Sequence, residues 1–264
     1  MNVETVLEIS HLFGGYGKDT VIKDAGLKIQ KGEFLGIIGP NGSGKSTLLR
    51  LMSRVLPPQQ GTIKFQGRDI QRIVLKEFCR HVAFVPQDTL INFPFSVEEV
   101  VLMGRIPHLG RLQYETKQDM EIAERCLSLT DTLSIKGKGI DGISAGERQR
   151  AIIAKALAQE PILLFLDEPT SHLDIGHEAQ IMDLLKRLNR DKSLTIVMVL
   201  HDLNLASEYC SRIILLDRGG VFQDGTAEEI LTYQNIESVY KTTVIVNKNP
   251  LTGKPFVVLV SQEK

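Results

Sequence analysis

Residues 34–52 read FLGIIGPNGSGKSTLLRLM, and the fold follows from this stretch. The apolar run Phe34–Ile38 predicts a strand buried on both faces. It leads into GPNGSGKST, Gly39–Thr47, which satisfies the pattern GxxxxGK[ST], and the residues up to Met52 have helical character. A glycine-rich loop between a buried strand and a helix is typical of a phosphate-binding loop. An ordinary glycine turn is the alternative, and the strand–loop–helix context argues against it.

The residue types of this loop predict how it would hold a nucleotide. Its glycines let backbone N–H groups turn inward, and the N-terminus of the following helix adds positive potential. We expect Lys45 to reach the β- and γ-phosphates and the Ser46 hydroxyl to ligate magnesium. The predicted nucleotide-binding residues are Gly39, Pro40, Asn41, Gly42, Ser43, Gly44, Lys45, Ser46 and Thr47.

Two carboxylates follow a second buried run, Ile162–Leu166. Asp167 and Glu168 therefore leave the end of a strand, where ligands gather in open α/β sheets. We expect Asp167 to hold magnesium through a bound water, and Glu168 to act as the general base on the attacking water. An acidic pair before Pro169 would by itself indicate a turn and a helix cap, but the phosphate loop in the same chain favours catalysis.

Three other positions carry weaker signals. His201 follows the buried run Thr195–Leu200, so it could reach the γ-phosphate region from a neighbouring strand end, although a lone histidine is usually structural. Gln87 would by itself be a loop amide. Ser144 and Glu147 form a capping box ahead of a helical stretch. That segment is either a well-capped helix start or a second anion site, and the residues alone do not decide between them.

The pattern along the chain predicts an α/β fold with a mainly parallel sheet, because buried strands alternate with helical segments such as Glu178–Leu188. Other segments predict an antiparallel flank at the N-terminus, a helical insert and a C-terminal hairpin. The flank comprises Val3–Ile9, Val21–Ile29 and Thr62–Phe65, with turns at Gly14, Gly15, Gly17 and Gly61. The insert runs from Ser96, which forms a capping box with Glu99, to about Leu133. The hairpin pairs Thr243–Val246 with Phe256–Val260.

Composition excludes several classes of protein. Of 264 residues, 42% are apolar and 24% charged, which is the balance of a globular protein rather than a disordered one. Lys plus Arg (31) nearly cancels Asp plus Glu (32), so we expect no electrostatic pull toward nucleic acid. The N-terminus does not read as a secretory signal, and no apolar run approaches the ~20 residues that span a bilayer. Any membrane role is therefore expected to be peripheral.

Taken together, the ordered motifs resemble those of the nucleotide-binding subunit of ATP-binding-cassette (ABC) transporters. They are GPNGSGKST at 39–47, Gln87, ISAGERQR at 143–150, LLFLDEPT at 163–170, SHLD at 171–174 and His201. The resemblance covers nearly the whole chain and implies a P-loop NTPase core of ABC ATPase architecture in a single domain, 1–264. Within it, we expect a core of residues 1–94 and 140–264 and a helical subdomain of residues 95–139.

The resemblance also implies roles that spacing does not show. Tyr16 resembles the aromatic residue that stacks on adenine. Gln87 resembles the residue that senses the γ-phosphate and magnesium and faces the transmembrane partner. His201 resembles the switch that contacts the γ-phosphate. The implied catalytic residues are thus Glu168, His201, Gln87 and Lys45, and the implied magnesium ligands are Ser46, Gln87 and Asp167.

Ser144 and Gly146 resemble the signature that completes the ATP site of a second, identical subunit, and Asp174 resembles the loop that communicates between the two sites. Such a homodimer would enclose two ATP molecules between symmetric subunits. Ala145 stands where this family usually has the first of two glycines. A methyl group there restricts positive φ and could crowd the approach to phosphate.

Four strings resemble the importers of iron-siderophores, haem, cobalamin and related metal chelates: VVLMGRIPH at 100–108, SHLDIGHE at 171–178, HDLNLA at 201–206 and NPLTGKPF at 249–256. The resemblance implies ATP hydrolysis at the cytoplasmic face of the membrane, coupled to permease subunits and indirectly to a periplasmic or extracellular substrate-binding protein. Arg105 and His108 would lie near the permease, unless their segment is an ordinary surface loop. The alternatives are a soluble ABC-type ATPase acting on nucleic acid or ribosomes, and a small-molecule phosphotransferase or nucleotide-gated module.

Overall fold

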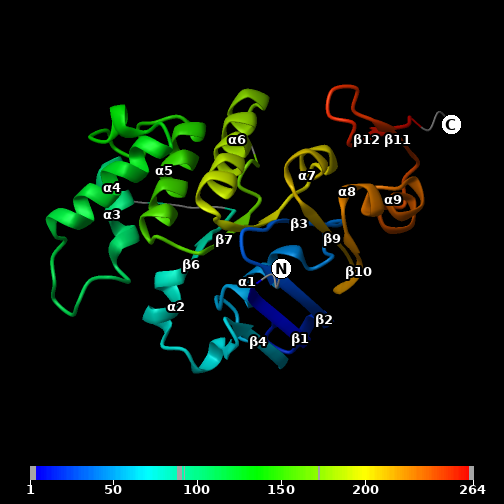
Figure 1. The fold of residues 1–264 in the computed structure, drawn as a ribbon, viewed down its shortest axis with the longest axis horizontal. Coiled ribbons are helices and arrows are strands. Elements are labelled where there is room, and N and C mark those ends of the chain that lie inside the picture. The colour runs from blue at the N-terminus through cyan, green and yellow to red at the C-terminus, as the bar shows by residue number, and fades with distance from the viewer. Residues whose placement is uncertain (1–3, 88–90, 92, 172, 262–264) are drawn as a thin grey trace. The chain divides into compact units, whose positions relative to one another are not determined.

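The computed structural model describes residues 4–87, 91, 93–171 and 173–261 (Figure 1). The chain divides into two compact units, one made of residues 1–72 and 195–264 and the other of residues 73–194. The phosphate-binding loop belongs to the first unit, and the acidic pair after the second buried run belongs to the second.

The first unit begins with an antiparallel sheet in the strand order β2-β1-β4-β5. Its strands are β1 (Thr5–Tyr16), β2 (Asp19–Gln30), β4 (Gln60–Phe65) and β5 (Arg68–Asp69), and η1 (Ile70–Arg72) follows. This confirms the predicted N-terminal flank. The strands are longer than predicted, because buried and exposed residues alternate well beyond the apolar runs that were recognised.

The predicted turns at Gly14, Gly15 and Gly61 are wrong, since all three glycines lie inside strands. Pairing of β1 with β2 shifts register around Gly14 and Gly15. A Cβ on Gly15 would lie 1.9 Å from the Asp19 carbonyl oxygen, so glycine is needed there for close approach of two strands. Gly17 does lie in the turn between β1 and β2, with φ of 59°.

The core of the first unit is a parallel sheet built around β3 (Phe34–Ile38). It pairs in parallel with β8 (Thr195–Val199) on one side and with β9 (Arg212–Asp217) on the other. Every residue of β3 and β8 is buried, as their continuous apolar runs predict. β10 (Gly220–Gly225) adds an antiparallel edge to β9. The helix after the glycine-rich loop is α1 (Lys45–Met52).

The C-terminal part of the first unit contains α7 (Leu203–Tyr209), α8 (Ala227–Ile230) and α9 (Tyr233–Tyr240). It ends in an antiparallel hairpin of β11 (Val244–Lys248) and β12 (Pro255–Leu259), which confirms the predicted hairpin. Sequence patterns did not predict these three helices or β9 and β10.

The second unit contains α2 (Leu75–His81), the parallel pair β6 (Val82–Val85) and β7 (Leu163–Asp167), and a group of helices. In Figure 1, α3 (Val97–Leu102), α4 (Lys117–Leu129) and α5 (Ala145–Ala158) lie side by side. The remaining elements are η2 (Met103–Arg105), η3 (Leu133–Ile135) and α6 (Ile175–Lys192). The predicted capping box of Ser96 and Glu99 begins α3. The predicted helical insert is therefore confirmed as helical.

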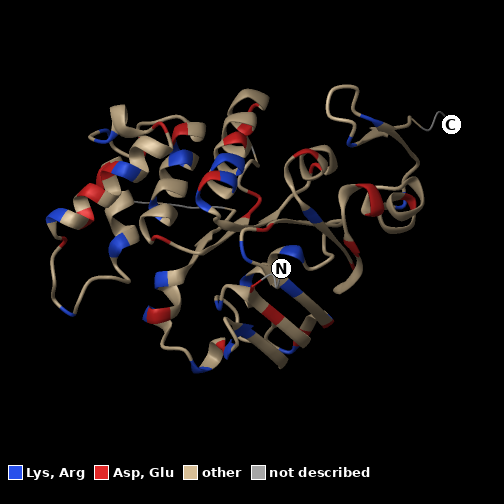
Figure 2. Cartoon of the chain, viewed as in Figure 1, with Lys and Arg blue, Asp and Glu red and all other residues tan. Residues whose placement is uncertain are grey.

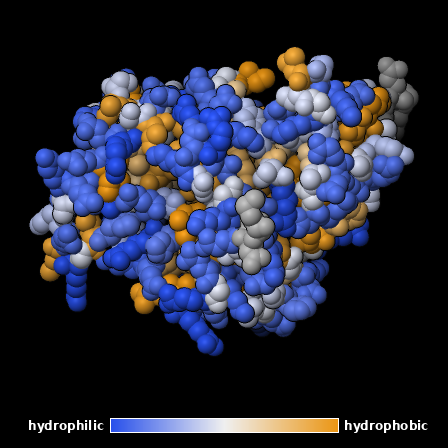
Figure 3. Space-filling model, viewed as in Figure 1, coloured by the Kyte–Doolittle hydropathy of each residue, from blue (hydrophilic) through white to orange (hydrophobic). Residues whose placement is uncertain are grey.

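Basic and acidic residues are interspersed along the chain, with both signs on single helices such as α4 and α6 (Figure 2). On the face drawn in Figure 3, hydrophobic residues form small groups among hydrophilic ones. In the part of the chain that the structure describes, no helix is both long enough and apolar enough to cross a membrane.

Candidate active site

The glycine-rich loop between β3 and α1 is shaped as an anion-binding nest. Gly39, Gly42 and Gly44 have φ of 149°, 79° and 101°, a left-handed region that glycine adopts without strain. Gly44 caps α1 without any side-chain hydrogen bond, so no side chain of its own competes at the helix N-terminus. Backbone N–H groups in this arrangement form a concave site for phosphate.

Lys45 lies inside this nest. Its side chain is buried, and its Nζ donates to the carbonyl oxygens of Gly39 at 2.9 Å and Pro40 at 3.1 Å. These bonds curl the ammonium group back over the loop. A buried lysine held by neutral carbonyls is electrostatically suited to receive an anion, because the positive charge is little screened there.

Ser43 supplies a further sign that the loop fits a phosphate group. Its Oγ is buried and has no hydrogen-bond partner among the described residues. A Cβ on Gly39 would lie 2.7 Å from this oxygen and 2.4 Å from the Leu216 carbonyl oxygen, so only glycine fits there. A buried hydroxyl usually has a partner, and a polar ligand at the loop would provide one.

His201 belongs to the same unit as the loop. The parallel register pairs Ile37 with Val199, and the Leu200 N–H donates to the Ile37 carbonyl oxygen at 3.0 Å. The chain therefore leaves β8 at His201 at the same level as it leaves β3 at Gly39. The histidine is exposed at the carboxyl edge of this sheet, as its position in the sequence predicts.

Tyr16 ends β1 and is 45% exposed. Its hydroxyl accepts a hydrogen bond from Arg50 of α1 at 2.9 Å. Leu51 of α1 packs on Gly14 of the same strand, where a Cβ would come within 2.7 Å of the leucine side chain. The structure thus ties Tyr16 to the helix that begins at the phosphate-binding loop.

In the second unit, Asp167 and Glu168 lie at the carboxyl end of β7. Asp167 is fully buried, and Glu168 is nearly so. Glu168 has φ of 49°, an unusual backbone conformation for a residue with a side chain. Its Oε2 accepts a hydrogen bond from the Gln87 Nε2 at 2.6 Å. The structure thereby joins a strongly predicted residue to a weakly predicted one 81 positions away.

The side chains predicted to hold magnesium offer a hydroxyl, an amide and a carboxylate oxygen, from Ser46, Gln87 and Asp167. Oxygen donors of this kind suit a hard divalent cation, and Mg²⁺ usually keeps several waters besides one or two carboxylates. The donor set therefore fits the ion. In the described residues no group of three or more His, Cys, Asp or Glu side chains could hold a metal ion.

Ser144 is the N-cap of α5, and the predicted capping box is present. Its Oγ accepts from the Glu147 N–H, and its own N–H donates to the Glu147 carboxylate at 2.8 Å. This backbone hydrogen bond holds the pKa of Glu147 below its ordinary value. Ser144 and Ala145 are exposed, whereas Gly146 is buried.

The restriction expected at Ala145 does not arise. Ala145 is the first residue of α5 and lies outside the left-handed region, so its backbone conformation is one that alanine adopts freely. The helix cap therefore tolerates the methyl group.

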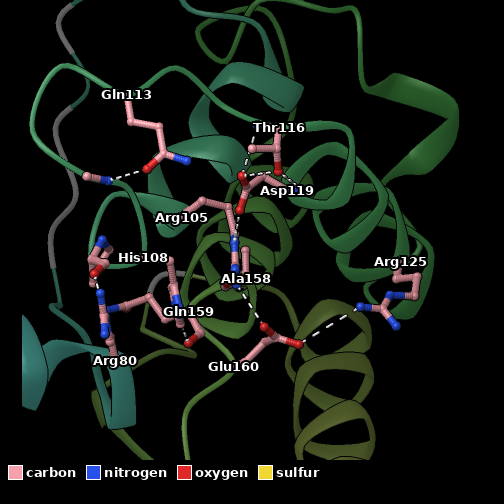
Figure 4. A network of polar contacts seen from close by, with 12 residues as sticks. Arg80, Arg105, His108, Gln113, Thr116, Asp119, Arg125, Ala158, Gln159 and Glu160 are labelled. Carbon is pink, nitrogen blue, oxygen red and sulfur yellow. Dashed lines mark hydrogen bonds and ion pairs between the residues drawn. The ribbon is translucent and has the colours of Figure 1, made fainter.

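Sequence reasoning missed a buried ionic cluster around Arg105 (Figure 4). Arg105 donates through Nε to Asp119 at 2.8 Å, and through Nη1 to the Ala158 carbonyl oxygen at 2.7 Å and to Glu160 at 2.9 Å. Its guanidinium group points inward, although the string VVLMGRIPH placed it in a candidate surface loop. The capping box of Thr116 and Asp119, readable from TKQD at 116–119, was the available signal.

The candidate residues thus fall into two sets. The first unit carries Tyr16, the loop 39–47 and His201, and the second carries Gln87, Asp167, Glu168, Ser144 and Gly146. Apart from Tyr16, which ends the antiparallel strand β1, these residues lie at the carboxyl ends of parallel strands or at a helix N-terminus, which are the places where α/β folds bind phosphate ligands. A glycine nest, a capped glycine turn and an acidic pair, in this order along the chain, define a P-loop nucleotide hydrolase.

A family model described as "ABC transporter" matches residues 22–171. The chain belongs to the ABC transporter family, and it is an ATPase of the ABC class. It is 40% identical over 244 residues to the ferric enterobactin transport ATP-binding protein FepC of Escherichia coli (strain K12), an alignment that covers 92% of this chain and 90% of FepC.

Solved structures agree that the chain belongs to the ABC transporter family. One neighbour is an ABC transporter of metal-chelate type in an inward-facing conformation, with a TM-score of 0.86, 27% identity and coverage of 98% of both chains. Another is a dimeric, post-hydrolysis ATP-binding cassette bound to ADP and Pi, with a TM-score of 0.73, 28% identity and coverage of 84% of this chain and 98% of that one. The predicted fold class is confirmed.

Proposed function

We propose that this chain binds and hydrolyses ATP in order to power an importer of a metal chelate, such as an iron-siderophore, haem, cobalamin or a related complex. The single observation that carries the hydrolytic part is the hydrogen bond between Gln87 and Glu168 beside the buried Asp167. It places an amide and a carboxylate together at a strand end, where a water attacking phosphate would be held.

The proposed site takes ATP through the first unit. Backbone N–H groups of the loop 39–47 and Lys45 bind the phosphates, Tyr16 stacks on adenine, and His201 contacts the γ-phosphate. Ser46, Gln87 and Asp167 would hold Mg²⁺. The ion, when bound, neutralises charge that develops on the transferring phosphoryl group.

The proposed chemistry is transfer of the γ-phosphoryl group to water. Glu168 accepts the proton of the attacking water, and the Gln87 amide orients that water through the contact it already makes with the carboxylate. The hydrogen bond from Gln87 holds the Glu168 carboxylate before ATP binds. Burial of both acidic residues excludes competing bulk water.

The proposed active form is a homodimer. Ser144 is the exposed N-cap of α5, and its capping box forms a helix N-terminus with Gly146 in the first turn. Such a helix N-terminus binds phosphate, so a second copy would bring it to the ATP of the first. The dimeric cassette among the solved neighbours supports this arrangement.

The proposed permease contact is a groove of about 650 Å³ in the second unit, lined by Leu75, Lys76, Cys79, Ile106, Pro107 and Leu109 among others. Its apolar lining, with lysine and arginine at the rim, suits an amphipathic helix from a membrane partner. Three contacts hold residues 107–109 beside the groove. Lys76 donates to the Leu109 carbonyl oxygen. Arg80 donates to the Pro107 carbonyl oxygen at 2.8 Å, and His108 donates to the Gln159 carbonyl oxygen at 2.9 Å (Figure 4).

The proposed place of work is the cytoplasmic face of the membrane, where the chain is peripheral. A substrate-binding protein would act on the permease and not on this chain. The similarity to FepC and to the metal-chelate type transporter supports the class of solute. A net charge of −1 favours this proposal over an ATPase that acts on nucleic acid.

The proposal is tested with the variant Glu168→Gln, which blocks proton transfer but keeps the nucleotide-binding loop. We expect it to elute as a dimer with MgATP in size-exclusion chromatography with light scattering, and to release phosphate about 100-fold or more slowly than the unsubstituted protein. The variant Lys45→Ala/Glu168→Gln is the matched control and should remain monomeric. A Glu168→Gln protein that binds ATP but stays monomeric at all MgATP concentrations would refute the dimeric site.

A further inference from the structure

The glycine at position 146 is not required by its own backbone. Gly146 is the second residue of α5 and lies outside the left-handed region, so any L-residue could adopt its conformation. A glycine inside a helix makes the helix less stable than an alanine would, because glycine loses more backbone entropy on folding. The presence of glycine at this position therefore indicates that there is no room for a side chain.

The room is taken by His177, in the first turn of α6. A Cβ on Gly146 would lie 2.3 Å from Cδ2 of the His177 ring, 2.7 Å from Cγ and 3.0 Å from Nε2. Separations this short are not found between real atoms. The flat imidazole thus covers Gly146 so closely that even a methyl group is excluded.

The ring cannot readily turn away, because Asp174 holds it. The Asp174 side chain caps α6: its Oδ1 accepts from the His177 N–H at 2.9 Å, and its Oδ2 accepts from the ring Nδ1 at 2.7 Å. These contacts, the backbone hydrogen bond first, lower the pKa of Asp174. The imidazole is therefore fixed on one edge by Asp174 and lies against Gly146 on the other.

We propose that His177 is a positioning residue that joins the loop ending at Asp174 to the turn Ser144–Gly146, so that both meet the nucleotide of the second copy as one surface. In this chain, position 146 is glycine because the His177 ring fills the space that a side chain would need. The inference rests on the proposed function, because the turn acts on a second copy's ATP. It adds to that surface a residue to which the string SHLDIGHE assigned no role.

The competing explanation is that Gly146 is small because phosphate approaches it. The two explanations differ in one respect, namely whether removal of the ring makes a methyl group tolerable. If the ring excludes the methyl group, His177→Ala rescues Gly146→Ala. If phosphate excludes it, the rescue fails in every assay that involves the dimer.

The first measurement is thermal unfolding of the ATP-free protein, which does not depend on the proposed function. We expect Gly146→Ala to lower the melting temperature by about 5 °C, since overpacking a filled site is destabilising. Gly146→Ala/His177→Ala should melt within about 2 °C of His177→Ala. Gly146→Ala/His177→Phe is the matched control: phenylalanine keeps a ring over Gly146, so its deficit should remain. If Gly146→Ala lowers the melting temperature by the same amount in the unsubstituted, His177→Ala and His177→Phe proteins, the His177 ring does not exclude a side chain at position 146 and the inference is wrong.

The second measurement is the MgATP concentration for half-maximal dimerisation in the Glu168→Gln background. We expect Gly146→Ala to raise it about 10-fold or more, and Gly146→Ala/His177→Ala to return it to within about threefold of His177→Ala. His177→Ala alone should raise it several-fold, because Asp174 and the turn are no longer joined. Nucleotide affinity of the monomer should stay unchanged in all variants, because the phosphate-binding loop is intact.

The outcomes separate the inference from the proposed function. If His177→Ala restores the melting temperature of Gly146→Ala but not its dimerisation, position 146 is glycine because phosphate approaches it. The inference is then wrong, and the proposed dimer is still supported. If His177→Ala dimerises at the parent's ATP concentration, the positioning role is wrong. If the Glu168→Gln parent does not dimerise, the proposed function fails, the positioning role fails with it, and the melting series alone decides whether His177 excludes a side chain at position 146.

Discussion

At the residue scale, Glu168 shows how backbone geometry prepares a side chain for chemistry. Its left-handed φ of 49° is costly for a residue with a Cβ and persists only where surrounding contacts hold it. Here the Ser171 Oγ and N–H both donate to the Glu168 carbonyl oxygen, at 2.9 Å and 3.1 Å, and Gln87 holds the carboxylate. The carboxylate is consequently oriented without help from a ligand.

Ala145 permits a prediction that separates conformation from contact. Because Ala145 is exposed and helical, replacing it with glycine should leave MgATP-dependent dimerisation of the Glu168→Gln protein unchanged within about twofold. The same change should lower the free energy of unfolding by up to about 1 kcal/mol, since glycine loses more backbone entropy. Urea titration and light scattering measure the two effects. Markedly tighter dimerisation by Ala145→Gly would show that the methyl group crowds the partner's phosphate.

At the element scale, the cluster around Arg105 fastens the turn after α3 to two helices. Arg105 reaches the cap of α4 through Asp119 and the end of α5 through the Ala158 carbonyl oxygen. A Cβ on the preceding Gly104 would lie 2.1 Å from the Lys155 carbonyl oxygen, so backbone and helix are in direct contact. Removing one member of such a buried pair is far more destabilising than losing an exposed ion pair.

The same cluster predicts a pH dependence of stability. Burial raises the pKa of Asp119, but hydrogen bonds from Thr116 and Arg105 outweigh burial and lower the pKa from its ordinary value of 3.8 to about 2. A depressed carboxylate pKa adds stability above the unfolded pKa, and this is lost as pH falls toward the folded pKa. We therefore expect the stability difference between the unsubstituted protein and Asp119→Asn to be constant above about pH 5 and to shrink by on the order of 2 kcal/mol toward pH 2.

Urea titrations of the two proteins between pH 3 and pH 6 measure this difference. Glu121→Gln, at an exposed position of α4, is the control and should show no comparable trend. A pH-independent gap between the unsubstituted protein and Asp119→Asn would contradict the assignment of Asp119 as an ionised, buried carboxylate.

The C-terminal hairpin packs against α7, a helix that local patterns did not reveal. The Asn204 amide accepts from the Val257 N–H at 2.7 Å and donates to its carbonyl oxygen at 3.1 Å, and so adds α7 to the edge of β12. Lys254 donates to the carbonyl oxygens of Ser207 and Glu208 at the end of α7. Asn204 of the string HDLNLA and Lys254 of the string NPLTGKPF thus both join α7 to the hairpin.

Asn204→Ala should release the hairpin without unfolding the rest of the chain. Two hydrogen bonds are lost, and the free energy of unfolding should fall by about 1–3 kcal/mol. Limited proteolysis should then cleave within residues 249–254 at a faster rate, as mass spectrometry of the fragments would show. Asn189→Ala, which removes a side-chain bond to Leu194 in the other unit, should not change that rate. Equal cleavage rates in Asn204→Ala and Asn189→Ala would show that Asn204 does not hold the hairpin against α7.

At the scale of the whole molecule, the proposed partner contact gives the sharpest prediction. Ile106 lies at the groove with 60% of its side chain exposed, while Leu251 is 93% exposed in the hairpin turn. Ile106→Asp should abolish co-purification with the permease but leave ATP hydrolysis by the isolated subunit unchanged, because an exposed carboxylate alters only the groove surface. Leu251→Asp is the matched control and should retain the permease. If Ile106→Asp and Leu251→Asp retain the permease equally, the permease contact does not lie at this groove.

Much of the fold could be predicted because its elements have strong local signals. Continuous apolar runs identified β3, β7 and β8, and capping boxes at Ser96 and Ser144 marked two helix starts. β9 and β10 escaped prediction, since a strand such as Arg212–Asp217 follows a short helix without a strong turn signal. Gly14, Gly15 and Gly61 misled prediction because a glycine serves equally in a turn and in a close approach of strands.

The sequence by itself determined the chemistry of this protein: a loop able to bend around phosphate, an acidic pair at a strand end and a capped helix start, because each depends on residues adjacent in the chain. Tertiary structure decided which distant residues meet, namely Gln87 with Glu168, Arg105 with Asp119 and Gly146 with His177. Side-chain hydrogen bonds and steric exclusion act over a few ångströms in space, whatever the separation along the chain, so no local pattern could reveal them.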